Sequence, residues 1–155
     1  MKNLLVKSLA IMSLLSAITL PVFAQQLTVS EGYIRATIPG TNVSSAYMTL
    51  KNTSDTPITL IGATSHFSDR IEIHEHVMTD SMMSMRQRDK LIIDAHSEVQ
   101  LQPFGYHLMI FNLANPLVAE ESASITLKFS QGDSQTIELP IQSIKKPAKD
   151  SHKHH

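Results

Sequence analysis

Histidine and methionine recur at defined spacing in the middle of the chain. Ten residues separate His74 from Met85, 21 separate Met85 from His107, and one separates His107 from Met109. Thioether sulfur combined with imidazole nitrogen suits Cu(I), a soft ion that accepts methionine readily. Calcium and magnesium prefer oxygen ligands, whereas zinc sites use cysteine, histidine and carboxylates. The residue types therefore predict a Cu(I) site.

Apolar and polar residues alternate along 70–78 and along 107–112, as in strands with one buried face. If the apolar face points inward, the histidines and methionines of each segment project together from the other face, at its outer surface or rim. Side chains two residues apart on one strand face lie about 6–7 Å apart at the backbone, so long side chains can converge on one ion. The side chains on that face are His74, His76 and Met78 in the first segment, and His107 and Met109 in the second.

Methionine is concentrated between residues 78 and 85, which hold four of the six methionines that follow residue 24. Methionine often fills gaps in a core, but such crowding in a polar segment is unusual for core residues. We expect Met82 and Met83 to lie in a loop before a short strand. The soft groups that could support the four ligands, relay copper or form a weaker site are His76, Met78, Met82 and Met83. Met48 is expected in the core, and His66 and His96 at the surface or in turns.

The first 24 residues have the pattern of a secretory signal peptide. Lys2 and Lys7 precede an apolar run over 9–20, and small residues ending at Ala24 form a cleavage site before Gln25. A membrane anchor is the alternative, but this run is shorter than the roughly 20 residues that a span requires. We expect export to the periplasm, with no membrane span after cleavage.

Composition narrows the classes of function further. The 155 residues less the first 24 leave 131, enough for one domain with a real core. The 13 basic residues less Lys2 and Lys7 leave 11 against 14 acidic residues, a net charge of −3, so no basic face indicates nucleic acid. The absence of cysteine excludes disulfides, thiol nucleophiles and blue-copper centres, which need a Cys thiolate.

Short apolar alternations separated by turn residues predict an all-β sandwich or Greek-key barrel over 25–144. The last stretch, 145–155, lacks large apolar residues and is expected to be a flexible tail. Its imidazoles, His152, His154 and His155, favour Cu(II); the alternative is a solvated basic tail with weak, unselective metal affinity.

The strands that we expect in the β-domain are 27–35, 45–51, 58–65, 70–78, 84–87, 98–101, 107–112, 124–129 and 135–139.

The spacing of His74, Met85, His107 and Met109, together with the short sequence motifs around these residues, resembles the PCuAC family of periplasmic Cu(I) chaperones. The motifs that match are Ala46–Asn52, Ile73–Glu75, Met83–Arg86 and Pro103–Met109. The resemblance covers nearly all residues beyond 24 and implies a cupredoxin-like β-barrel. It also implies that one Cu(I) is bound by His74, Met85, His107 and Met109. The implied recipient is the CuA subunit of cytochrome c oxidase, reached directly or through a thiol-bearing copper chaperone.

Three alternative functions are a metal buffer, an enzyme and a purely structural domain. A periplasmic buffer or scavenger of copper or another metal would use the same residues without a dedicated recipient. An enzyme is not expected, because Glu72 and Glu75 flank His74 on opposite strand faces and no Gly-rich phosphate loop or serine nucleophile elbow is present. A purely structural β-domain leaves the methionine and histidine spacing unexplained. We expect a monomer.

Overall fold

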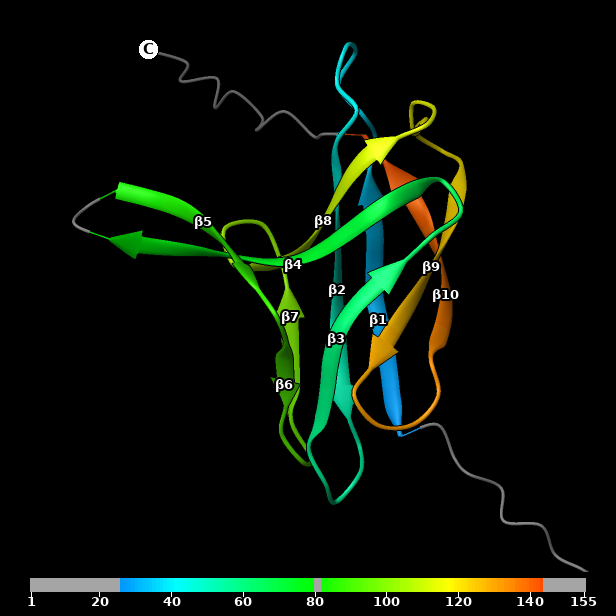
Figure 1. Ribbon diagram of the computed structural model, residues 1–155. Coiled ribbons are helices and arrows are strands. Elements are labelled where there is room, and N and C mark those ends of the chain that lie inside the picture. The colour runs from blue at the N-terminus through cyan, green and yellow to red at the C-terminus, as the bar shows by residue number, and fades with distance from the viewer. Residues whose placement is uncertain (1–25, 80–81, 144–155) are drawn as a thin grey trace, which may run out of the picture.

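The computed structural model describes residues 26–79 and 82–143, which form ten β-strands (Figure 1). Within this described part there is no helix that could span a membrane. The predicted signal peptide 1–24 and the tail 145–155, including His152, His154 and His155, lie outside the described residues. The strands are β1 (Leu27–Arg35), β2 (Ser44–Asn52), β3 (Ile58–Thr64), β4 (Ser68–Thr79), β5 (Met82–Arg88), β6 (Leu91–Ile93), β7 (Glu98–Leu101), β8 (Tyr106–Leu113), β9 (Ser122–Phe129) and β10 (Gln135–Gln142).

The sheet closes on itself. Its strand order is β5-β4-β8-β7-β2-β1-β10-β9-β3-β6, and an additional pairing of β4 with β3 completes a barrel. Strand β8 also pairs directly with β2. The predicted all-β barrel is therefore confirmed. Closure protects most strand edges, which would otherwise present unpaired backbone groups.

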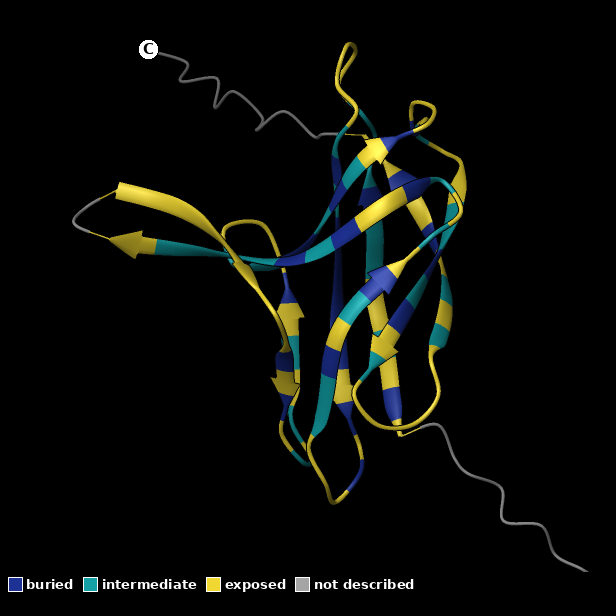
Figure 2. Cartoon of the chain, viewed as in Figure 1, coloured by how far each residue is buried: buried dark blue, intermediate teal, exposed yellow. Residues whose placement is uncertain are grey.

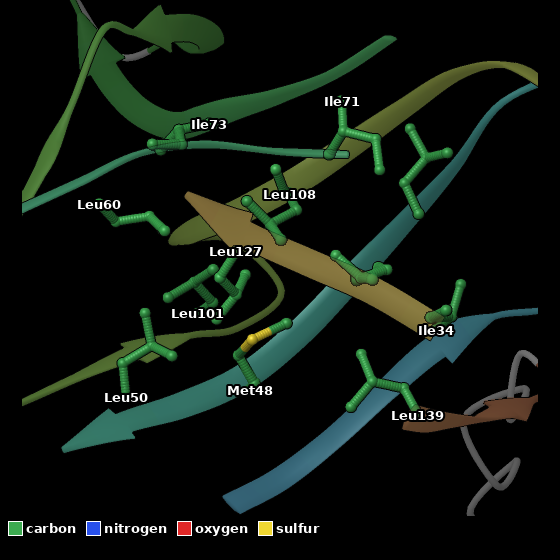
Figure 3. Close-up of a cluster of buried hydrophobic side chains, with 14 of the residues drawn as sticks. Ile34, Met48, Leu50, Leu60, Ile71, Ile73, Leu101, Leu108, Leu127 and Leu139 are labelled. Carbon is green, nitrogen blue, oxygen red and sulfur yellow. The ribbon is translucent and has the colours of Figure 1, made fainter. Parts of the chain in front are cut away.

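The core fills the inside of this barrel with alternate residues of the strands (Figure 2). Ile34, Leu50 and Leu108 are fully buried there, and so is Met48, as predicted (Figure 3). Because neighbouring residues of a strand point to opposite faces, burying Ile73 and Leu108 directs His74 and His107 to the outside of the barrel wall.

A buried amide joins three segments at one end of the barrel. Nδ2 of Asn52 donates to the carbonyl oxygens of Thr56, Ile93 and Asp94 at 2.8, 3.1 and 3.1 Å. Its Oδ1 accepts from the backbone N–H and the hydroxyl of Ser54 at 2.9 and 2.7 Å. Every polar atom of this side chain is thus satisfied, which offsets the cost of burying it.

Strands β4 and β5 form a long hairpin that projects from the barrel (Figure 1). The prediction that Met82 and Met83 lie in a loop is wrong, because β5 begins at Met82 and both residues pair with β4. All seven residues of β5 are exposed, so no alternation of apolar and polar residues marks the strand in the sequence. The three-residue strand β6 was also not predicted, since a segment so short carries no period.

Candidate metal centre

Two of the predicted ligands lie directly opposite each other on neighbouring strands. His74 of β4 is paired with His107 of β8, and their ring centroids are 5.9 Å apart. Residues directly opposite on an antiparallel pair share a face of the sheet. The non-local pairing of β4 with β8 therefore joins two histidines that are 33 positions apart in the sequence.

The third predicted ligand, Met85, lies opposite His76 across β4 and β5. The His76 and His107 rings are 5.1 Å apart, closer than those of His74 and His107. His76 thus lies between the methionine of the hairpin and the buried histidine. The sequence assigned it only an auxiliary role, although its parity with His74 was visible there.

The fourth predicted ligand, Met109, follows His107 on the same face of β8. It is paired with Glu72 of β4 on one side and with Ser45 of β2 on the other. Its half-buried side chain lines a hollow together with Ile38 and Ser45. The structure therefore places the four predicted residues along one face of three adjacent strands, with Met85 and Met109 at opposite ends.

Burial differs strongly among these residues, and this corrects the expectation that the whole set lies at an exposed rim. His107 is only 2% exposed, whereas Met85 is 50% exposed. The rings of Tyr47 and His76 both lie beside His107. The centre therefore has a buried histidine and an accessible thioether.

Hydrogen bonds orient two of the imidazoles. The carbonyl oxygen of Gly105 lies 3.2 Å from Nδ1 of His107 and can only accept, so Nδ1–H donates and the lone pair is on Nε2. A carboxylate oxygen of Glu72 lies 2.8 Å from Nε2 of His74, so Nε2–H donates there. That bond leaves the lone pair of neutral His74 on Nδ1. In metal sites, the histidine ring nitrogen that does not bind the metal usually donates a hydrogen bond to a carboxylate or carbonyl oxygen.

Two ring nitrogens at this centre are buried without a hydrogen-bond partner: Nδ1 of His74 and Nδ1 of His76. A buried polar atom left unpaired costs about 1–3 kcal/mol. A soft cation on these nitrogens would remove that cost. They are therefore the places where the fold itself indicates a ligand.

The electrostatics of the centre keep His107 neutral. Burial lowers the pKa of His107, the hydrogen bond to Gly105 opposes this, and the neighbouring imidazoles of His76 and His74 lower it further. Only the neutral imidazole has a lone pair for a metal. His107 is thus in its ligating form at neutral pH.

Oxygen and nitrogen donors alone do not form a site in the described part of the chain. Across 26–79 and 82–143 there is no group of three or more His, Asp or Glu side chains arranged to hold a metal ion. The soft donors that neighbour the histidines of this centre along β5 and β8 are the thioethers of Met85 and Met109. The mixture of thioether and imidazole is the donor set of Cu(I).

Comparison with known proteins shows the family to which this chain belongs. The family model described as "LpqE-like: Putative lipoprotein LpqE-like" matches residues 27–141. The chain belongs to the LpqE-like family. The LpqE-like chain is 29% identical over 136 residues to the putative lipoprotein Lxx21020 of Leifsonia xyli subsp. xyli (strain CTCB07), covering 83% of this chain and 81% of that protein.

Solved structures similar to the LpqE-like chain include PCuAC domains. The solution structure of Cu(I)-DR1885 from Deinococcus radiodurans is 32% identical, with a TM-score of 0.60, and the match covers 77% of this chain and 81% of that one. Apo-DR1885 is 27% identical over 94% of this chain and 98% of that one, with a TM-score of 0.62. The copper-bound PCuAC domain from PmoF2 is 21% identical over 77% and 94% of the two chains, with a TM-score of 0.66, and shows the shared fold. The predicted PCuAC resemblance and cupredoxin-like fold are confirmed.

Proposed function

We propose that this chain is a copper chaperone of the cell envelope that binds Cu(I) through His74, Met85, His107 and Met109. The observation that supports this most directly is the cross-strand meeting of His74 and His107, where a buried nitrogen has no partner. Each imidazole has its other nitrogen held by Glu72 or by the Gly105 carbonyl. Histidines held in this way need no reorientation before they bind a metal.

The two thioethers give the proposed site its preference for Cu(I) over Cu(II). Thioether sulfur is soft and neutral, and protons do not compete for it at working pH. Met85 lies opposite His76 on β5, and Met109 lies two residues beyond His107 on β8. His76 is a fifth candidate donor, because it lies beside both Met85 and His107.

The uneven burial of the site suits release as well as binding. A partner's thiolate can first displace Met85, which is half exposed, and the buried His107 can leave last. The recipient that we propose is the CuA centre of cytochrome c oxidase, reached directly or through a thiol-bearing copper protein. The relatives named above include a Cu(I)-bound and a copper-bound PCuAC domain, which supports copper as the cargo.

An anaerobic titration tests the site. Protein beginning at Gln25 competes with a chromophoric chelator for Cu(I), with the three tail histidines, His152, His154 and His155, replaced by alanine in a parallel set. We expect one tightly bound Cu(I), lost in the Met85→Leu, Met109→Leu double variant and kept in the Met82→Leu control. Tight binding that survives in the double variant would contradict the proposed site.

Copper transfer to an acceptor protein tests whether this chain acts as a chaperone. Copper-loaded protein is mixed anaerobically with an apo CuA domain, with and without a dithiol copper chaperone, and CuA absorbance is followed after oxidation. Formation of the CuA spectrum supports delivery. Tight Cu(I) binding without transfer in either mixture would favour the alternative of a periplasmic copper buffer.

A further inference from the structure

The outer part of the β4–β5 hairpin carries soft donors that the proposed four-residue site does not use. Met78 of β4 lies directly opposite Met83 of β5, one pair beyond the His76–Met85 pair. Pairs separated by two residues lie on the same face of a hairpin. Three thioethers and one imidazole therefore line one face in succession: Met78, Met83, Met85 and His76.

Packing does not explain these methionines. Met78 is 68% exposed and Met83 is 51% exposed, and neither contributes to the core cluster. Leaving methionine in water forgoes the burial of its apolar surface, worth about 1.5–3 kcal/mol for a full side chain. Their exposed placement forgoes that gain, so burial in the core is not the role of either side chain.

The opposite face of the same hairpin has a different chemistry. There the carboxylate of Glu75 accepts a hydrogen bond from Nε of Arg88 at 2.7 Å and forms an ion pair with that guanidinium. Ser84 and Arg86 share this face of β5 with Met82, the single hairpin methionine on it. The ion pair therefore lies on one face of the hairpin, and three of its four methionines lie on the other.

We propose a second, outer Cu(I) site formed by Met78 and Met83, with Met85 shared between it and the inner site. Alpha carbons directly opposite on antiparallel strands are about 4.5–5.5 Å apart, within reach of two flexible thioethers on one ion. The next pair, His76 and Met85, begins about 6.6 Å along the strand, at roughly 3.3 Å per residue. A swing of the Met85 side chain can therefore pass the ion inward.

The outer site deepens the proposed function and rests on it, as a place of copper entry and exit. Only ligands exchange in this step: copper stays Cu(I), no electron moves, and one thioether leaves the ion as one imidazole nitrogen joins it. The outer site is weaker than the inner one because it has no imidazole donor, and because Met78 and Met83 alone remain for it once Met85 binds Cu(I) in the inner site. We therefore expect the inner site to fill first and the outer site second.

Methionine methyl groups report on the two sites separately. Mature protein beginning at Gln25, labelled with 13C in the methionine methyl groups, is titrated anaerobically with Cu(I) and followed by NMR. The first equivalent should shift Met85 and Met109, and the second should shift Met78 and Met83 together. Buried Met48 and opposite-face Met82, which is 73% exposed, are internal controls that should not move.

The possible outcomes separate the outer site from the proposed function. Shifts at Met85 and Met109 alone would overturn the outer site and leave the chaperone site intact. Equal shifts at Met82, Met78 and Met83 would also overturn it, because they would show unselective binding to any exposed thioether. Absence of a shift at Met85 and Met109 would overturn the proposed function itself.

A matched pair of variants completes the test. The Met78→Leu, Met83→Leu double variant keeps the apolar volume but removes both sulfur atoms, and Met82→Leu changes the same hairpin on its other face. We expect the double variant to lose the second equivalent of Cu(I), and to load the inner site more slowly, while the control matches wild type. Retention of the second equivalent by the double variant would overturn the outer site.

Discussion

Glu72 accepts a hydrogen bond from Nε2 of His74 at 2.8 Å, two residues away on the same face of β4. The other carboxylate oxygen of Glu72 lies 3.5 Å from Nε of Arg70, whose guanidinium stands over the ring of Phe111. The carboxylate is therefore held from both sides. It fixes the tautomer of His74 that leaves Nδ1 free for the proposed Cu(I) ion.

Replacing Glu72 by alanine should weaken Cu(I) binding about 10- to 100-fold, as is typical when the partner of a metal-binding histidine is removed. The imidazole of His74 should also lose its preference for the Nε2–H tautomer, which long-range 15N NMR of the apo protein detects. Asp69→Ala is the matched control, since the Asp69 carboxylate accepts from the exposed side chain of Asn112 instead. Unchanged affinity in Glu72→Ala would show that the bond does not position His74 for copper.

His76 should contribute a donor to the inner site. We expect His76→Phe, which keeps a ring beside Phe104, to weaken Cu(I) binding by more than about tenfold, or about 1.4 kcal/mol. The measurement is the same chelator competition, with exposed His66→Phe as the control. Wild-type affinity in His76→Phe would restrict the donors to the four residues that the sequence spacing selects.

The stability of the metal-free protein should fall in mild acid because of His107. Its pKa in the folded protein is lowered from the ordinary value of 6.5, mainly by burial, so the unfolded chain takes up a proton first as the pH decreases. The contribution of His107 is therefore fully present above pH 6.5 and is lost as the pH falls from there through the lowered pKa. Urea unfolding at several pH values should show a weaker pH dependence in His107→Gln than in wild type. An identical pH dependence in both proteins would contradict this assignment.

Asn52 should be important for folding and not for copper. Asn52→Ala removes the side-chain donor to the carbonyl of Ile93 and the acceptor of the buried backbone N–H of Ser54. We expect the free energy of unfolding to decrease by about 2–3 kcal/mol, measured by urea titration. Exposed Asn115→Ala should change it by less than about 0.5 kcal/mol. A small effect in Asn52→Ala would mean that water replaces the lost amide.

Alternation alone predicted much of the barrel wall, because the face to which a strand residue points depends only on its parity in the sequence. It correctly gave the bounds 27–35 and 98–101 and the burial of Met48. It gave only 84–87 of β5 (Met82–Arg88) and put Met82 and Met83 in a loop, because this strand is paired on one side and exposed to water on both faces. Backbone hydrogen bonds to the neighbouring strand hold such a strand in place, and these bonds do not require its own side chains to alternate between apolar and polar.

The sequence by itself determined the donor chemistry, since methionine and histidine are properties of residue type, and it determined which of them share a face of one strand. The tertiary structure decided which strands lie side by side, and with what register. It brought His74 opposite His107, Met85 opposite His76, and Met78 opposite Met83. The physical reason is that register follows from packing the whole core: a slip of one residue would turn each of these side chains to the other face.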